Sequence, residues 1–354
     1  MNHTDRAGSG IEADPALKGG VSAFSWTDKA LRERGQPHPA LKSLAAISAL
    51  GLLLTGLCAM SHAAGRGPRP ARAKPAPWRL YAQGSYEYDS NVLQLPETDA
   101  SSLTGKSDTS WFGVIYSEYK YKPRRIGATH LRLLGLYQDY RKLNELDLAG
   151  ASLGIQQDID LRLSQARLRY DAQHFLLDRR SYLWSHGAAL DADIIAARHW
   201  KWAAGYKLDI KRFVSAQHRG FEGLRHEATM TLERQSESIL PRARAQAGGF
   251  RDDVRDRSFR HRGLQGSAEL ALKLPWNAEL SLQPEVQSRW YDKTGVSGQP
   301  YRRELLQKYT VAMSRFFLGH VTVEASYSRI FNRATISRYS YKKWVSAGSL
   351  SLFF

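Results

Sequence analysis

The chain has 354 residues, is 42% hydrophobic and 24% charged, and carries a formal net charge of +17 at pH 7. It contains no run of about 18 apolar residues, so the sequence excludes a helix that spans a bilayer. The one cysteine, Cys58, lies inside the longest apolar run. The rest of the chain therefore has no cysteine with which to form disulfides.

The longest apolar run has the features of an export signal. It extends from Ile47 to Met60, follows Lys42 and precedes Ser61-His62-Ala63-Ala64, a small-residue cleavage pattern. We therefore predict a signal peptide at residues 42–64. Export also argues against nucleic acid as a partner, although a strongly basic composition is typical of nucleic-acid-binding proteins.

The segments on either side of this signal peptide differ in composition. Residues 1–41 are polar and longer than an ordinary signal n-region. We interpret them as an N-terminal extension produced by an over-extended start site, and a real cytoplasmic extension is the alternative. Residues 65–77 are rich in Pro, Arg and Ala, which predicts an extended linker.

From Trp78 onward the sequence repeats one pattern, a run of alternating apolar and polar residues followed by a turn. This period of two is that of a β-strand, whose successive side chains point to opposite faces. In the first run Trp78 and Tyr88 stand about 33 Å apart along a strand, or about 23 Å along the membrane normal at a 45° tilt. That distance matches an apolar band edged by aromatic girdles.

Fourteen such runs follow the linker, which predicts an all-β fold. They begin near residues 78, 108, 127, 148, 165, 182, 199, 223, 240, 260, 276, 301, 319 and 338. A spacing of about 21 residues per strand and connector fits a barrel and is too short for βαβ units. We predict a closed antiparallel transmembrane β-barrel of about 14 strands over residues 78–354, in which the runs near 182 and 240 are the weakest.

The predicted connectors alternate in length. Connectors that follow even-numbered strands are mostly short, such as Lys122–Ile126 and Leu161–Ser164, whereas several that follow odd-numbered strands are longer, such as Asn91–Ser107, Val214–Glu222 and Asp252–Ser258. Bacterial outer-membrane barrels have short periplasmic turns and longer outer loops. The lengths therefore predict that the first strand starts at the periplasmic side and that the last strand returns to it.

The last run ends the printed sequence on an aromatic residue. Its apolar or small face includes Trp344, Leu350, Leu352 and Phe354, opposite a face rich in serine. This run resembles the C-terminal assembly signal of bacterial outer-membrane barrels, which implies the barrel assembly machinery as a partner. An ordinary edge strand that ends on Phe is the alternative.

Alternation alone does not decide which face of a barrel meets water. A water-soluble barrel would turn its apolar face inward and fill its interior with it. The export signal and the aromatic residues at strand ends favour the opposite orientation, with apolar side chains toward lipid. We therefore predict the outer membrane of a Gram-negative bacterium as the location, with outer-membrane lipid and lipopolysaccharide as partners.

The polar face of the runs then becomes the predicted lining of the lumen. Its predicted pore-lining residues include Arg79, Glu87, Asp89, Arg132, Arg167, Arg169, Lys201, Lys207, Lys211, Arg242, Arg244 and Arg289. With Lys120, Lys273 and further Asp and Glu residues, the basic and acidic side chains on this face are close to balance. Two interpretations stay open, a lumen cross-braced by ion pairs and a conduit with a basic stripe.

The positive excess lies mostly in the predicted connectors. The clearest groups are Lys122–Arg125, Arg179–Arg180 and the arginines between Arg251 and Arg262. Outer-loop arginines could bind the phosphates of lipopolysaccharide, because guanidinium groups match phosphate geometry. Charge that is simply solvated is the alternative.

No arrangement in the sequence indicates catalysis, a cofactor or a metal, so we do not expect an enzyme. The histidines after the signal are scattered, with no Ser or Asp at a hydrolase spacing. Asp89-Ser90-Asn91, with Glu97 and Asp99, could supply oxygen ligands to Ca²⁺. The segment lacks the full calcium-loop pattern, however, and an Asx-turn that leaves the first strand is the favoured interpretation.

The segment Glu87-Tyr-Asp-Ser-Asn-Val-Leu-Gln-Leu-Pro96 is similar to the "YDSNVxxLP" opening of a group of proteobacterial outer-membrane barrels found in exopolysaccharide export loci. The C-terminal part from Ala325 to Phe354 resembles their last hairpin. It also resembles the fourteen-stranded barrel of surface lipoprotein assembly modifiers. Those proteins usually carry a periplasmic helical-repeat domain before the barrel, and residues 65–77 are too few to form one.

These resemblances imply a passive outer-membrane channel for export of a surface polymer (exopolysaccharide) or for small solutes. An anionic polysaccharide or a periplasmic export partner would then bind it. Two alternatives stay open. One is a translocation barrel like that of the assembly modifiers, and the other is a closed barrel that binds partners through its outer loops.

Overall fold

The chain folds as fourteen strands. In this computed structural model the structure describes residues 77–94, 107–122, 127–161, 164–197, 200–236, 240–293, 301–317 and 319–354. The strands are β1 Trp78–Asp89, β2 Asp108–Tyr121, β3 Thr129–Tyr140, β4 Leu148–Asp160, β5 Ser164–Leu177, β6 Arg180–Ala197, β7 Trp200–Phe213, β8 Gly223–Gln235, β9 Arg242–Val254, β10 His261–Leu274, β11 Ala278–Tyr291, β12 Arg303–Phe317, β13 Val321–Ala334 and β14 Tyr341–Phe353. Every strand start predicted from the alternation lies within about three residues of the observed one, including those near 182 and 240. The predicted N-terminal extension, the signal peptide and nearly all of the linker lie outside the described residues.

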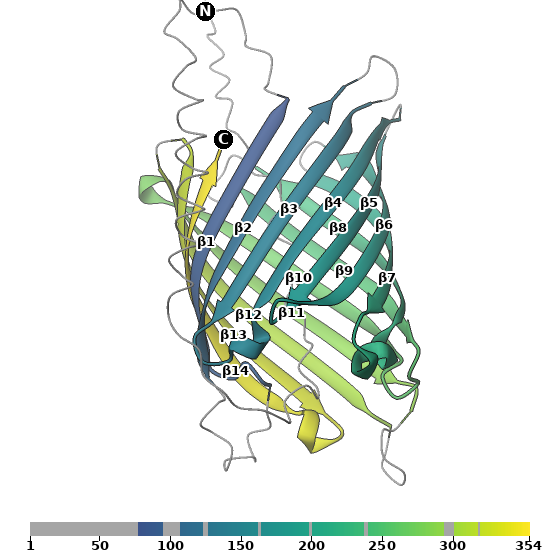
Figure 1. Ribbon diagram of the computed structural model, residues 1–354. Coiled ribbons are helices and arrows are strands. Elements are labelled where there is room, and N and C mark those ends of the chain that lie inside the picture. Colours follow the sequence, from purple (N-terminus) through teal and green to yellow (C-terminus); the bar gives the residue numbers. More distant parts are fainter. Residues whose placement is uncertain are drawn as a thin grey trace, which may run out of the picture. The chain divides into compact units, whose positions relative to one another are not determined.

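Each strand pairs antiparallel with its neighbours in sequence, and β1 pairs with β14, so the sheet closes into a barrel (Figure 1). The closing pair has Tyr81 opposite Phe353 and Asp89 opposite Val345. Beyond the last ladder pair, the backbones of Leu80 and Phe354 exchange hydrogen bonds of 3.0 and 2.9 Å. Because closure removes both sheet edges, the strands pair their backbone groups without water. The predicted closed barrel of fourteen strands is confirmed.

The two ends of the barrel differ. At the end that holds the start of β1 and the end of β14, connectors are short, as in η4 Pro275–Asn277. The opposite end carries longer loops, with η2 Asn144–Leu146, η3 Ala216–Phe221 and η5 Ser337–Tyr339 (Figure 1). We call the two ends the terminal end and the loop end. No helix among the described segments is long and apolar enough to cross a membrane.

Two hairpins are closed by left-handed backbone. Asp178 and Arg179, which join β5 to β6 at the loop end, have φ values of 46° and 62°, and Trp276 and Asn277 at the terminal end have 58° and 57°. Positive φ at both central residues is the conformation of a type I′ turn, whose twist matches that of the flanking strands. The β5–β6 connector is therefore a tight turn, unlike the longer connectors at the same end.

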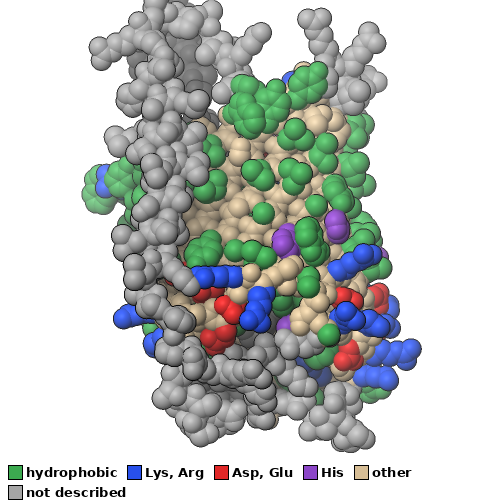
Figure 2. Space-filling model, in the orientation of Figure 1, with side chains coloured by type: hydrophobic (Ala, Val, Ile, Leu, Met, Phe, Trp, Pro, Cys, Tyr) green, Lys and Arg blue, Asp and Glu red, His purple; other side chains and the backbone are tan. Residues whose placement is uncertain are grey.

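The exterior of the barrel is apolar. Large side chains that point away from the interior are widely exposed, such as Leu153 at 63%, Leu264 at 60% and Met230 at 59%. Figure 2 shows apolar side chains over the strands, whereas Lys, Arg, Asp and Glu gather toward the loop end. A closed barrel with an apolar exterior and polar interior faces is a transmembrane barrel of the bacterial outer-membrane type. The predicted location in the outer membrane of a Gram-negative bacterium follows from this exterior.

A small apolar cluster interrupts the polar interior near the loop end. It consists of Phe175, Leu183 and Phe213, which are buried, and Phe221 of η3 packs against it. Phe175 and Phe213 lie on the same face as the predicted lining residues Arg167 of β5 and Lys211 of β7. Apolar packing here fixes η3 to the barrel wall, because burial of aromatic surface stabilises the contact.

One predicted connector is wrong at its start. The segment Asp252–Ser258 was predicted as a loop, but β9 continues to Val254. Asp252 and Val254 are buried, and Asp252 faces the interior, where Arg225 binds it. The charged run therefore does not break the strand, because its carboxylate is paired inside the barrel.

Candidate functional site

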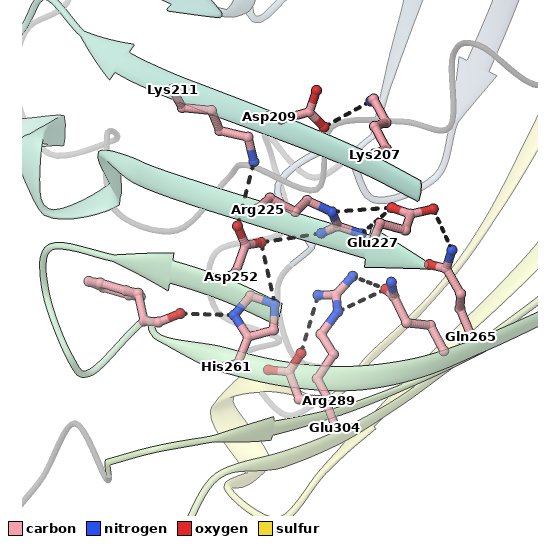
Figure 3. Close-up of polar contacts among 12 residues, drawn as sticks. Lys207, Asp209, Lys211, Arg225, Glu227, Asp252, His261, Gln265, Arg289 and Glu304 are labelled. Atoms are coloured by element: carbon pink, nitrogen blue, oxygen red, sulfur yellow. Dashed lines mark hydrogen bonds and ion pairs between the residues drawn. The ribbon is translucent and has the colours of Figure 1, made fainter. Parts of the chain in front are cut away.

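The interior wall formed by β7 to β12 carries the most connected charged network of the described residues (Figure 3). Its centre is Asp252 of β9, whose side chain is only 5% exposed. Arg225 of β8 lies 3.2 Å from this carboxylate, His261 of β10 lies 3.7 Å away, and Lys211 of β7 lies 3.9 Å away. A buried carboxylate is costly unless it is paired, and three basic groups from three strands surround this one.

The network continues away from Asp252 on both sides. Arg225 also binds Glu227 at 3.3 Å, and the amide of Gln265 donates to Glu227 at 2.7 Å. On β7, Lys207 binds Asp209 at 2.8 Å. Alternate residues of one strand face the same side of the sheet. The Arg225–Glu227 and Lys207–Asp209 pairs therefore lie within one strand, whereas the Gln265–Glu227 hydrogen bond joins two strands.

On β11 and β12 the network reaches the loop end. Arg289 donates to Gln287 at 2.8 Å through Nε and lies 3.5 Å from Glu304. Arg302, which immediately precedes β12, binds the same Glu304 and lies 4.2 Å from the ring of Tyr291. Ion pairing and ring stacking together hold this guanidinium against the wall.

A second ladder of ion pairs runs along β3 to β7. Arg132 binds Asp171 at 2.9 Å, and Arg169 binds Asp191 at 2.7 Å. Asp193 binds both Arg167 at 2.6 Å and Lys201 at 2.8 Å. Each pair joins different strands, so cations and carboxylates hold one another against the wall instead of extending into the lumen.

Smaller groups of charges complete the wall. Arg242 of β9 lies 2.5 Å from Glu269 of β10 and 3.7 Å from Glu279 of β11. At the terminal end, Glu118 and Asp158 each lie 3.0 Å from a ring nitrogen of His130. The side chains of all three are at least 88% buried. The charged wall thus reaches from β2 to β12.

Between β12 and β1 the interior carries a group of hydroxyl side chains, beside the charged residues Arg79, Glu87 and Asp89 of β1 and Lys343 of β14. We call this group the hydroxyl stripe, and it consists of Thr310 of β12, Ser326 and Ser328 of β13, Ser349 and Ser351 of β14, and Ser85 of β1. Register places Thr310 opposite Ser328 and Ser349 opposite Ser85. The Thr310 and Ser328 hydroxyls are 2.8 Å apart, and Ser351 lies 3.2 Å from the hydroxyl of Tyr81. Register also places Glu324 of β13 opposite Ser349.

All twelve predicted pore-lining residues lie on the interior face of their strands. Eight of them belong to the network around Asp252, to the ion pairs of β3 to β7 or to the Arg242 group. A ninth, Arg244, stands opposite Glu233. The other three lie on β1. Arg79 is 3.8 Å from Glu118, Asp89 binds Lys343 of β14 at 2.8 Å, and Glu87 accepts from Ser85 at 3.3 Å. Their pore-lining role stays a prediction, but many of these charges are tied to the wall.

Sequence reasoning missed several charged residues of the barrel interior. They are His130, Asp191, Asp193, Arg225, Asp252, His261, Glu304, Lys308 and Lys343. Asp191 and Asp193 could have been found, because an Asp-x-Asp pair on one strand faces an Arg-x-Arg pair, Arg167 and Arg169, on the preceding strand. The poor alternation of this run hid the signal.

The predicted assembly residues lie on the exterior of β14 and at its end. Trp344 packs against Tyr88 of β1 at a centroid distance of 4.7 Å and against Tyr327 of β13 at 6.1 Å. Leu350 and Phe354 are exposed. These residues therefore cover the closing pair of strands, and their role in assembly stays a prediction.

The predicted Asx-turn after β1 is confirmed, since the backbone N–H of Asn91 donates to Asp89 Oδ1 at 2.8 Å. Glu97 and Asp99, the other candidate calcium ligands, lie outside the described residues. Within the described ranges, no group of three or more His, Cys, Asp or Glu side chains could hold a metal ion. The Asx-turn accounts for the local role of Asp89 without a ligand.

Comparison with known proteins adds only a fold-level likeness. No protein-family model and no curated protein matches the sequence. Among solved structures, a loop L8 deletion mutant of OmpT, an outer membrane protein of Vibrio cholerae, is 8% identical with a TM-score of 0.48, over 78% of this chain and 99% of that one. OccAB3 of Acinetobacter baumannii is 8% identical with a TM-score of 0.43, over 78% and 98%. A "bacterial polysaccharide outer membrane secretin" is 9% identical with a TM-score of 0.43, over 78% and 97%.

Proposed function

We propose that this barrel is a passive outer-membrane channel for hydrated, hydroxyl-rich solutes, with a surface polysaccharide as its substrate class. The observation that supports the proposal is the presence of the hydroxyl stripe beside a wall of paired charges. Charges that are paired along the wall neutralise one another, so they repel neither cations nor anions strongly. A neutral hydrated molecule would meet no net electrostatic barrier there.

The hydroxyl stripe gives the proposal its substrate class. A serine or threonine hydroxyl both donates and accepts a hydrogen bond, so it can replace water at a sugar hydroxyl. Such exchange costs little, because a net hydrogen bond contributes only about 1 kcal/mol. Weak, repeated contacts of this kind suit passage, which requires that a solute leave each contact readily.

Conductance of the purified protein in planar lipid bilayers tests the channel itself. We expect a steady current in potassium chloride, and neutral oligosaccharide should reduce that current in a concentration-dependent way. Failure to conduct would overturn the channel and favour a closed barrel that acts through its outer loops. Conductance without any effect of oligosaccharide would overturn only the substrate class.

A triple variant in the hydroxyl stripe tests the proposed substrate class. Ser326→Ala, Ser328→Ala and Ser349→Ala remove three hydroxyls without a change of charge or an increase in volume. We expect unchanged salt conductance and weaker oligosaccharide block. The matched control, Ser288→Ala with Ser346→Ala, removes exterior hydroxyls of β11 and β14 and should change neither quantity.

A further inference from the structure

Three arginines and one tryptophan form a row across the exterior of β9 to β12 at the loop end. Register places Arg251 of β9 directly opposite Arg262 of β10. Trp290 of β11 lies opposite both Arg262 and Arg303 of β12. We call these four residues the arginine row. Its three arginines are exposed. Each is next in sequence to an interior residue of the same strand (Asp252, His261 and Glu304), so each lies on the exterior face.

The positive charge of the arginine row is only partly compensated. Like charges directly opposite each other on one face of a sheet are destabilising, and Arg251 and Arg262 are such a pair. Asp253 binds Arg251 at 2.8 Å and is shared with Arg260 of the adjoining loop at 3.6 Å. Within the part of the chain that the structure describes, no carboxylate lies within 4.0 Å of the Arg262 or Arg303 guanidinium. The sheet therefore concentrates positive charge that an external anion could neutralise.

The arginine row also stands at the edge of the apolar exterior. Two residues along each strand toward the terminal end, Arg262 gives way to Leu264 and Arg303 to Leu305. That step is about 7 Å of strand. Tryptophan is enriched where the apolar band meets water, and Trp290 lies in the row itself. A ligand bound here would contact cations with one part and apolar side chains with the adjacent part.

We propose that the arginine row binds the phosphate groups of a phosphorylated glycolipid of the outer leaflet, such as lipopolysaccharide. Arg262 and Arg303 donate to the phosphate oxygens, a geometry for which the guanidinium fork is suited. The acyl chains lie on the exterior beside Leu264, Val286 and Leu305. A soluble anion would use only the cationic part of this surface, whereas an amphiphile uses both parts. This site is independent of whether the lumen conducts.

Native mass spectrometry of the purified full-length protein, titrated with phosphorylated lipid A, tests this site. Arg262→Gln combined with Arg303→Gln should weaken binding at least tenfold, because each lost charged contact with phosphate is worth roughly a factor of ten. Arg315→Gln is the matched control, since Arg315 is an exposed exterior arginine at the terminal end of β12. It should bind lipid A as the unaltered protein does.

A dephosphorylated lipid A should bind the unaltered protein about as weakly as phosphorylated lipid A binds the double variant. A heat-dependent shift in gel mobility shows that each variant is folded. Equal binding by the double variant and the unaltered protein would overturn the site, as would an equal loss in Arg315→Gln. Binding of phosphatidylglycerol as tight as that of lipid A would overturn the assignment to a glycolipid.

Discussion

His130 Nε2 lies 3.0 Å from Asp158 Oδ2, a contact that joins β3 to β4 inside the barrel. The other ring nitrogen, Nδ1, lies 3.0 Å from Glu118 Oε1 of β2, so one imidazole connects three strands. We predict that His130→Phe destabilises the barrel by about 3–5 kcal/mol, because it leaves two buried carboxylates without this partner. Urea unfolding in lipid vesicles, followed by tryptophan fluorescence, measures the change.

The matched control for this prediction is His320→Phe. His320 is exposed in the short β12–β13 connector, so its loss should change the free energy of unfolding by less than about 0.5 kcal/mol. Equal unfolding midpoints for His130→Phe and the unaltered protein would show that the imidazole bridge does not contribute to stability.

Gly263 allows Phe250 to lie over the interior face of β10. A Cβ at Gly263 would stand 2.2 Å from the backbone oxygen of Ser288 and 2.4 Å from Phe250 Cζ. We predict that Gly263→Ala costs about 1–3 kcal/mol of unfolding free energy, because the backbone oxygen cannot move aside as a side chain can. Gly266→Ala is the control, since its Cβ would meet no atom closer than 3.6 Å. A second substitution, Phe250→Ala, should not restore stability.

Asp147, in the β3–β4 loop, should make the free energy of unfolding depend on pH. Burial and the nearby charges of Asp139 and Asp178 raise the pKa of Asp147 from 3.8 to about 6. The folded protein therefore binds a proton more tightly than the unfolded chain, so this stabilising contribution is complete below about pH 4 and is lost as pH rises through 6. The carboxyl is partly solvated, and we expect about 1 kcal/mol after screening.

Asp147→Asn tests this dependence, because an amide does not titrate. The difference in unfolding free energy between variant and unaltered protein should be constant below about pH 4. It should then change by about 1 kcal/mol in favour of the variant as pH rises through 6. A difference that is constant from pH 3 to pH 8, or a change of opposite sign, would contradict the assignment to Asp147.

Deletion of Phe354 should impair assembly more than stability. It removes the two backbone hydrogen bonds with Leu80, of 3.0 and 2.9 Å, whose combined net contribution is about 1–3 kcal/mol. The exposed ring contributes little more to the folded barrel. We therefore expect a large fall in heat-modifiable barrel in cell membranes and a small change after refolding in vitro. Phe354→Tyr keeps the terminal aromatic ring and the backbone hydrogen bonds, so it should assemble normally. Normal assembly of the deletion variant would contradict a role of Phe354 as an assembly signal.

The period of two in the sequence was enough to locate the strands but not to align them. β6 and β9 were the weakest predictions, yet their observed starts at Arg180 and Arg242 agree with the predicted positions near 182 and 240. The strands could be located there from the regular spacing of the runs, although the apolar and polar residues alternate poorly within them. In the runs with clear alternation, the period of two correctly placed Arg132 of β3 and Lys201 and Lys211 of β7 on the interior face.

What the sequence could not supply was the offset between strands. The bridge from Glu118 through His130 to Asp158 depends on which residues stand level on three strands. Arg251 and Arg262 were expected in a connector, and only register shows that they face each other on the exterior. Register comes from the closed geometry of the whole sheet, which no local pattern encodes.

All strand pairs except one join neighbours in the chain, and the exception is the closing pair of β1 and β14. Tyr81 and Ser351, in contact across that pair, are 270 residues apart. Most of the barrel can therefore form by pairing of consecutive strands. The final step, pairing of β1 with β14, must bring distant segments together at a cost in chain entropy. A circular permutant that links the old termini and opens the chain at the Asp178–Arg179 turn would keep every ladder and move this slow step to β5 and β6.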